Sequence, residues 1–252
     1  MKTKIKTPQE VAAMRESGRL LATVLATLRE AVQPGMSTKE LAEIAKRELR
    51  GTGGTPTILG MYGFPDVICI SLNDEVVHGI PSSKRIIKEG DLISLDFCVT
   101  YDGMITDAAT SVVAGQAAPK VARLLRDTEA ALYAGIQSLH DGVRVGDVAH
   151  AIETELKKGK YGIVRDMVGH GVGHELHEEP NIPNYGKKGT GPVLSAGMTI
   201  AIEPMATLGD FRVYIDIDGW TVRSNDRSLA AHFEHTVLIT QDGYDILTQL
   251  HS

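Results

Sequence analysis

Two acidic side chains lie inside apolar stretches of the sequence, where a carboxylate is costly unless it is paired or binds a metal ion. Asp96 interrupts the apolar run 92–99. The following Asp102-Gly103 predicts a two-residue hairpin turn, so that paired residue numbers sum to 205 and Asp107 faces Cys98. Asp96 then shares a face with Asp107, at a diagonal distance of about 7 Å between Cβ atoms. Two such carboxylates repel each other, and a divalent cation removes the repulsion.

Three further residues have the same character. Glu203 ends the apolar run 198–202, Glu234 lies within the strand-like run 230–239, and His170 lies between glycines. Any one of them is more often structural, and the alternative for the aspartates is one Arg pair and one exposed side chain. Together the four carboxylates and one imidazole indicate a metal centre.

The ligand types restrict the metal. Oxygen-rich sites suit Mn²⁺ and Fe²⁺, and Co²⁺ is also compatible. Four carboxylates balance the charge of two divalent ions, which in a two-metal site lie roughly 3.5–4 Å apart and share a water that ionises near neutral pH.

Two other patterns are rejected. The run His174-Glu175-Leu176-His177 has one residue between Glu and the second His, whereas the zincin motif needs two. The glycines around His170 lack the G-x-G-x-x-G spacing of a dinucleotide loop. Cys69 and Cys98 are most simply interpreted as core thiols.

Composition excludes several classes of protein. The chain has 252 residues, 42 % of them hydrophobic and 23 % charged, which rules out a disordered chain, a collagen or a coiled coil. The net charge of −6 argues against a nucleic-acid partner. Two cysteines argue against a disulfide scaffold and favour a reducing cytosol. Because neither a signal peptide nor an apolar run of about 18 residues is found, we expect no membrane partner.

Helices and hairpins must position the candidate ligands. A capping box at 7–10 starts a helix that ends at Pro34-Gly35, and a second box at 37–40 starts a helix that runs to the break at 51–54. Strands are predicted at 67–71, 91–100 and 104–113, and helices at 119–139 and 146–158. Short strands follow, with a second turn at Asp242-Gly243. Since no linker divides the chain, we expect one α+β domain over residues 1–252.

An internal echo suggests two related halves. The run 88–97 resembles the run 195–204, because each is a Gly-led apolar run that ends in a carboxylate, Asp96 or Glu203. Two pseudo-equivalent halves would each place an acid at a shared centre.

The chain resembles a type I methionine aminopeptidase essentially from end to end. The resemblance rests on the order and spacing of these motifs: Val76-Val77-His78-Gly79-Ile80-Pro81, Ser94-Leu95-Asp96, Thr106-Asp107, Gly169-His170-Gly171-Val172-Gly173, His177-Glu178-Glu179-Pro180, Ile202-Glu203-Pro204-Met205 and Phe233-Glu234-His235-Thr236. It implies the pita-bread α+β fold, with two pseudo-symmetric halves around a dinuclear metal centre. Because no N-terminal extension with Cys or His precedes the motifs, we expect the minimal, bacterial-type form.

The resemblance also assigns roles. It implies two divalent ions (Co²⁺, Mn²⁺, Fe²⁺ or Zn²⁺), with Asp107 and Glu234 bridging them, Glu203 relaying a proton, His177 stabilising the tetrahedral intermediate and His78 contacting the scissile amide. The implied metal ligands are Asp96, Asp107, His170, Glu203 and Glu234. The implied substrate-binding residues are His78, His177, Ile58, Met61, Phe64, Cys69, Leu176 and Trp220. Met61 and Phe64 stand where the family often has Tyr, and Leu176 where Phe is common, so the pocket stays apolar but its finer shape differs.

The expected activity is removal of the initiator methionine from nascent chains that have a small second residue. A metal-bridging hydroxide would attack the first peptide bond. The resemblance further implies a cytoplasmic monomer that works on nascent N-termini near the ribosome.

Two alternatives remain open. One is an X-Pro aminopeptidase or prolidase with the same fold and metals, although such relatives usually carry an added N-terminal domain and only about 55 residues precede the first β-region here. The other is a non-catalytic binding module, although such proteins typically lose ligands and all five are present.

Overall fold

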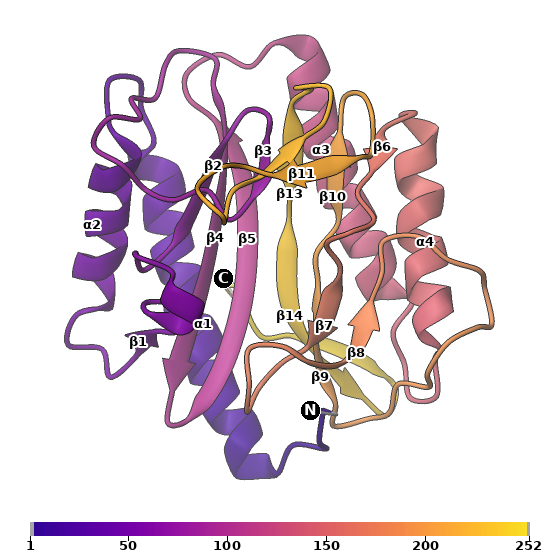
Figure 1. Cartoon of the computed structure of the whole chain (residues 1–252). Coiled ribbons are helices and arrows are strands. Elements are labelled where there is room, and N and C mark those ends of the chain that lie inside the picture. Colours follow the sequence, from indigo (N-terminus) through magenta and orange to yellow (C-terminus); the bar gives the residue numbers. More distant parts are fainter. Residues whose placement is uncertain (1–2, 251–252) are drawn as a thin grey trace.

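Along the chain, a pair of helices is followed by a series of strands, and this order occurs twice (Figure 1). The computed structural model describes residues 3–250. The α-helices are α1 (Pro8–Ala31), α2 (Thr38–Leu49), α3 (Pro119–Gln137) and α4 (Val145–Lys158), and a short 3₁₀ turn η1 spans Met61–Gly63. The strands are β1 (Thr55–Pro56), β2 (Cys69–Leu72), β3 (Glu75–Val77), β4 (Leu92–Tyr101), β5 (Met104–Val113), β6 (Gly162–Ile163), β7 (Gly169–Gly171), β8 (Glu178–Ile182), β9 (Thr199–Ile202), β10 (Met205–Thr207), β11 (Val213–Ile215), β12 (Val222–Ser224), β13 (Ala230–His232), β14 (Glu234–Thr240) and β15 (Gly243–Ile246).

A nine-stranded antiparallel sheet forms the centre of the fold. Its order is β1-β4-β5-β14-β9-β7-β8, with β2 also paired to β4 and β15 to β14. Two three-stranded sheets, β13-β10-β6 and β11-β12-β3, complete it. Among the described residues no helix is long and apolar enough to cross a membrane.

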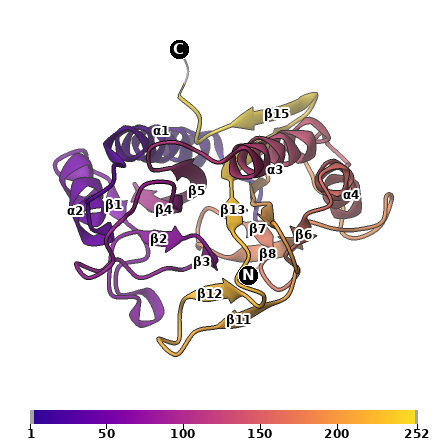
Figure 2. The same ribbon diagram turned by 90° about the horizontal axis from the view of Figure 1, so that it is seen from above.

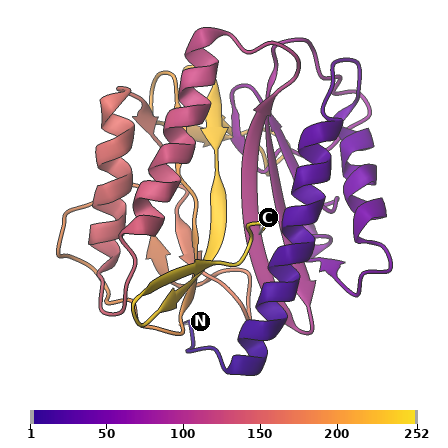
Figure 3. The ribbon, with the colours of Figure 1, turned by 180° about the vertical axis from the view of Figure 1, so that it is seen from behind.

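The helices cover one face of the central sheet (Figures 2 and 3). Helix α1 packs on β4 and β5, and α3 packs on α4 and β14. Two apolar clusters result: one includes Leu21, Leu28 and Phe97 in the first half, and the other includes Leu132 and Ile202 in the second. The halves meet where β5 pairs with β14. This arrangement agrees with the two pseudo-symmetric halves that the internal echo predicts.

The predicted hairpin register is confirmed. Tyr101 pairs with Met104 and Cys98 pairs with Asp107 along β4 and β5. Asp102 and Gly103 both have positive φ, 46° and 75°, which is the conformation that a two-residue type I′ turn requires. The turn chemistry therefore fixes which residues of the two strands share a face.

The predicted helix starts are also confirmed, and one turn prediction is wrong. Both capping boxes form, with Thr7 and Ser37 as N-caps. The second hairpin turn is displaced by one residue, because Thr240 pairs with Gly243 and the loop is residues 241–242. The register follows the Val237–Ile246 pair, in which both side chains are buried in the core.

The N-terminal segment is tied to the second half of the chain by a buried ion pair. Lys6 Nζ lies 3.2 Å from Glu178 Oε2, and neither side chain is accessible to solvent beyond 1 %. Glu178 Oε1 accepts the backbone N–H groups of His174 and Glu175. Lys6 Nζ also donates to Thr3 Oγ1. The pair therefore fixes the loop that leads into His177 and β8.

We predict that Lys6→Met destabilises the protein by about 3–5 kcal/mol, because it leaves the Glu178 carboxylate buried without its cation. The exposed Lys4 offers a matched control, and Lys4→Met should change the free energy of unfolding by no more than about 0.5 kcal/mol. Urea unfolding of the three proteins measures both values. Equal stability of the two variants would show that the buried pair does not hold the segment.

Candidate active site

All five candidate ligands project from one face of the central sheet in two adjacent rows. The first row has two parts. In β7, β9 and β14, His170 pairs with Ala201 and Ala201 pairs with Thr236. In β4 and β5, Cys98 pairs with Asp107. Thr236 joins the two parts, because its hydroxyl binds both the backbone N–H and the carbonyl of Asp107 at 2.8 Å.

The second row lies two residues along the strands. Ala109 of β5 pairs with Asp96 on one side and with Glu234 on the other, and Glu203 directly follows β9. Because paired residues of antiparallel strands point to the same face, Asp96 and Glu234 project beside each other across the small Ala109 side chain. Asp107, two residues from Ala109, joins them on that face. The sheet thus draws acids from both halves of the chain to one point.

The glycines on either side of His170 have a steric reason. A Cβ at Gly169 would lie 2.3 Å from the Ala201 carbonyl oxygen, and one at Gly171 would lie 2.9 Å from the Glu179 carbonyl oxygen. Only glycine fits where β7 runs this close to β8 and β9. The repeated glycines therefore serve backbone packing, and they place a single imidazole between two strands.

The orientation of the His170 ring is set by its own backbone. Nδ1 lies 2.9 Å from the Gly171 carbonyl oxygen and donates to it, which leaves the lone pair on Nε2. Nε2 lies 3.5 Å from Glu203 Oε1 and 3.9 Å from Asp107 Oδ2. Burial lowers the pKa of His170 to about 4, so the ring stays neutral and available as a ligand near neutral pH.

The carboxyl groups hold their protons more tightly than usual. Burial raises the pKa of Asp107 to about 6. Burial and then the charge of neighbouring acids raise the pKa values of Asp96, Glu203 and Glu234 well above their usual range. The carboxylates therefore need a nearby positive charge to be fully ionised at neutral pH.

These residues fit divalent metal ions. Glu234 Oε1 is buried and has no hydrogen-bond partner among the described residues. One oxygen of Asp107, one of Glu234 and a nitrogen of His170 lie within 4.8 Å of one another, and Asp96 and Asp107 form a similar group with Cys98. Carboxylate oxygens with an imidazole nitrogen are suitable donors for first-row divalent ions.

A cavity of about 220 Å³ opens beside the acids, and Asp96 and Asp107 line it. Phe64 and Trp220 pack edge to face in its wall, with ring centroids 5.2 Å apart. The structure brings to this cavity all the residues predicted to bind substrate: Ile58, Met61, Phe64, Cys69, His78, Leu176, His177 and Trp220.

His78 and His177, the two histidines at the cavity, differ in backbone conformation and in exposure. His78 has φ of +61°, a left-handed conformation that is uncommon for a residue with a side chain and is found at functional sites. Its neighbour Gly79 leaves no room for a Cβ, which would lie 2.3 Å from the Ile70 carbonyl oxygen. His177 is exposed, and its ring lies edge to face with that of His170 at 4.6 Å.

Sequence reasoning missed two residues near the acids. Cys98, interpreted as a core thiol, lines the cavity and donates from Sγ to Asp107 Oδ1 at 2.9 Å. The predicted pairing of Cys98 with Asp107 already contained this contact. His232 is buried near Glu203 and Glu234, and nothing in the sequence distinguished it from a core residue.

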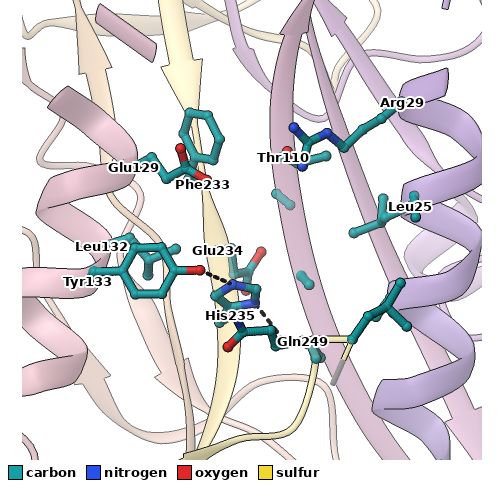
Figure 4. A pocket seen from close by; sticks show the side chains of 16 residues that line it. Leu25, Arg29, Thr110, Glu129, Leu132, Tyr133, Phe233, Glu234, His235 and Gln249 are labelled. Carbon is teal, nitrogen blue, oxygen red and sulfur yellow. Dashed lines mark hydrogen bonds between the residues drawn. The ribbon is translucent and has the colours of Figure 1, made fainter. Parts of the chain in front are cut away.

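A second cavity, of about 270 Å³, lies between α1 and α3 against β5 and β14 (Figure 4). His235 points into it from β14, with Nδ1 2.9 Å from Thr248 Oγ1 and Nε2 3.5 Å from the Tyr133 hydroxyl. Both ring nitrogens therefore have protein partners. His235 follows Glu234 directly, so successive side chains of β14 serve opposite faces of the sheet.

The pattern of Metallopeptidase family M24 matches residues 12–241. The chain belongs to this family. It is 44 % identical to Methionine aminopeptidase 1 of Bacillus subtilis over 97 % of this chain and 98 % of the relative. It is 45 % identical to Methionine aminopeptidase 1 of Mycobacterium tuberculosis over 95 % of this chain and 92 % of the relative. Within family M24 it is thus a member of the methionine aminopeptidases, which are hydrolases.

Solved structures agree with this placement in family M24. A methionine aminopeptidase from Thermotoga maritima superposes with a TM-score of 0.97 at 41 % identity, over 98 % of this chain and all of the other. Prolidase from Pyrococcus furiosus gives a TM-score of 0.78 at 23 % identity, over 98 % of this chain and 66 % of that one, which shows the shared pita-bread fold alone. Family M24 implies divalent metal ions, as the buried acids do.

We predict that metal affinity rises with pH, because protons and metal ions compete for carboxyl groups whose pKa values are raised. Below the pKa of Asp107, about 6, each displaced proton should make the affinity for Mn²⁺ rise about tenfold per pH unit. Calorimetry at several pH values, in buffers of different ionisation enthalpy, measures both affinity and proton release. A constant affinity without proton release would contradict the raised pKa values.

Proposed function

We propose that this member of family M24 removes the N-terminal methionine from polypeptides. The observation that carries the proposal is the apolar cavity of about 220 Å³ whose lining includes Asp96 and Asp107. A cavity of this size and polarity suits one unbranched, polarizable thioether side chain. The two bacterial relatives are methionine aminopeptidases by name, which supports the same substrate.

The acids would hold the metal. Asp96, Asp107, His170, Glu203 and Glu234 are the proposed ligands of two divalent ions (Co²⁺, Mn²⁺, Fe²⁺ or Zn²⁺), with Asp107 and Glu234 shared between them. When bound, such ions polarise the substrate carbonyl and lower the pKa of water at the site. The fixed tautomer of His170 supports its place in this set, because Nε2 faces Glu203 and Asp107.

Other side chains would act on the peptide. Glu203 is proposed to take a proton from the attacking water and pass it to the leaving amine. Its side chain keeps 12 % exposure, more than that of Glu234 at 2 %, which leaves it room to contact a reactant. His78 would contact the scissile amide, and His177 would stabilise the tetrahedral intermediate. Both histidines line the cavity beside Asp96 and Asp107, where the first peptide bond would lie.

The proposal also covers the substrate preference, the cellular compartment and the oligomeric state. We infer a preference for a small second residue and a substrate consisting of nascent chain N-termini near the ribosome. We also infer a cytoplasmic enzyme that works as a monomer, with residues 1–252 forming one catalytic domain. The buried free thiols Cys69 and Cys98 are consistent with a reducing compartment.

We predict release of methionine from a Met-Ala-Ser peptide in the presence of Mn²⁺ or Co²⁺. A Met-Trp-Ser peptide should be cleaved at least about tenfold more slowly if the second residue must be small, since tenfold corresponds to about 1.4 kcal/mol. An Ala-Pro peptide tests the prolidase alternative, and its preferential cleavage would support that activity instead. No release from any of the peptides with any divalent metal would refute the proposal.

We predict that Asp96→Asn and Glu234→Gln each abolish methionine release, because each removes a ligand charge while preserving side-chain size. The exposed Glu43→Gln on α2 is the control for the same chemical change and should keep wild-type activity. Metal content of each purified variant, measured by atomic emission, should fall for the two site variants only. Full activity of either site variant would remove that residue from the ligand set.

A further inference from the structure

The imidazole of His232 is buried at the end of β13 and held there from its backbone. The His232 backbone N–H donates to Ser111 Oγ at 2.9 Å, and Ser111 Oγ donates to the His232 carbonyl oxygen at 2.8 Å. Met205 of β10 pairs with His232 on the strand ladder. The ring keeps 2 % exposure, so its position is set by packing on every side.

Neither ring nitrogen of His232 has a hydrogen-bond partner among residues 3–250. A buried polar atom without a hydrogen bond is unfavourable, so a buried imidazole of this kind calls for a partner in the working protein. Nε2 lies 3.7 Å from Glu203 Oε2 and 3.8 Å from Glu234 Oε2. The ring therefore faces the proposed metal centre.

Two imidazoles flank the Glu203 carboxylate, one at each oxygen. His170 Nε2 lies 3.5 Å from Oε1, and His232 Nε2 lies 3.7 Å from Oε2. The two rings are not equivalent. His170 donates its Nδ1 proton to the Gly171 carbonyl oxygen, so a neutral ring presents only a lone pair at Nε2. His232 has no such bond at Nδ1 within the described part of the chain and is free to carry its proton at Nε2.

We propose that His232 is a positioning residue whose Nε2–H binds Oε2 of Glu203 and so directs Oε1 toward the centre that Glu203 shares with His170. Closing the gap of 3.7 Å by about 0.8 Å gives a normal N–H···O distance. Carboxylates that bind metals are commonly held by such outer hydrogen bonds, and losing one typically costs about 10–100-fold in metal affinity or activity. This inference rests on the proposed function, because it supports the role given there to Glu203.

The test compares His232→Gln, which keeps an N–H donor, with His232→Met, which fills the space without one. Isothermal calorimetry with Mn²⁺ should show affinity about 10–100-fold weaker for the Met variant and within about threefold of wild type for the Gln variant. Methionine release should follow the same order, with the loss in kcat rather than KM, because no substrate contact is removed. Equal loss in both variants would show that the N–H donor is not what His232 supplies, and no loss in the Met variant would show that His232 only fills space; either result would overturn the proposal.

His235→Met is the matched control, because it removes a half-buried imidazole from the opposite face of the sheet. It should lower the melting temperature, since Thr248 and Tyr133 lose their partner, while Mn²⁺ affinity stays within about threefold of wild type. A His235 variant that weakened Mn²⁺ binding as much as His232→Met would overturn the assignment to His232.

Pulsed EPR of the Mn²⁺-loaded protein separates positioning from direct ligation. We expect the nitrogen coupling of one imidazole in wild type and in His232→Met alike. A second coupling that disappears in His232→Met would make His232 a ligand and overturn the proposal. If wild type binds Mn²⁺ but releases no methionine, the proposed function fails, while the affinity and EPR comparisons still decide the role of His232.

Discussion

Mutual repulsion among four neighbouring carboxylates is the constraint on which the rest of the structure depends. Asp107 and Glu234 are buried, and Asp96 and Glu203 are half-buried. Bringing one charge out of water costs several kcal/mol, and here Asp96, Asp107, Glu203 and Glu234 share one face of a sheet. The raised pKa values of all four record this cost. Apolar packing on the opposite, helix-covered face must hold the strands at their spacing, and divalent cations turn the repulsion into attraction.

The two-row arrangement explains why the halves of the chain resemble each other. Each half supplies one acid from a strand beside the junction, Asp107 or Glu234. Each also supplies one from the next strand outward, either Asp96 within β4 or Glu203 directly after β9. Ala109 at the junction is small enough to let acids from both halves project beside it. Around these rows the protein adds neutral hydrogen bonds rather than further charge: Cys98 Sγ donates to Asp107, and the Gly171 carbonyl oxygen accepts from His170. The charge at the proposed metal centre therefore comes from the proposed ligands.

Local chemistry determined how far the sequence could predict this site. The Asp102-Gly103 turn and strict strand alternation were enough to place Asp96, Cys98 and Asp107 on one face. Glu203, Glu234 and His170 were also predicted, from acids in apolar runs and an imidazole between glycines. No local rule connects them to the first pair, and only the family resemblance assigned them roles. The buried ion pair of Lys6 and Glu178 was not predicted, because the two residues are 172 positions apart and neither lies in a local pattern that indicates such a pair. The second hairpin was misplaced because a core pair, Val237 with Ile246, sets its register more strongly than Asp-Gly does.

His232 and His235 show why residue type and burial do not by themselves identify a functional side chain. Burial lowers the pKa of His232 to about 3 and that of His235 to about 4, so both rings are neutral at physiological pH. They lie three residues apart and on opposite sides of Glu234. His235 has protein partners for both nitrogens on the helix-covered side, which completes its hydrogen bonding and gives it a structural role. Among the described residues His232 has no such partner on the acid side, where Glu203 and Glu234 are within 4 Å. The difference that matters is which donor or acceptor the fold leaves unsatisfied, because an unsatisfied buried group is the one that a metal-bound carboxylate can use.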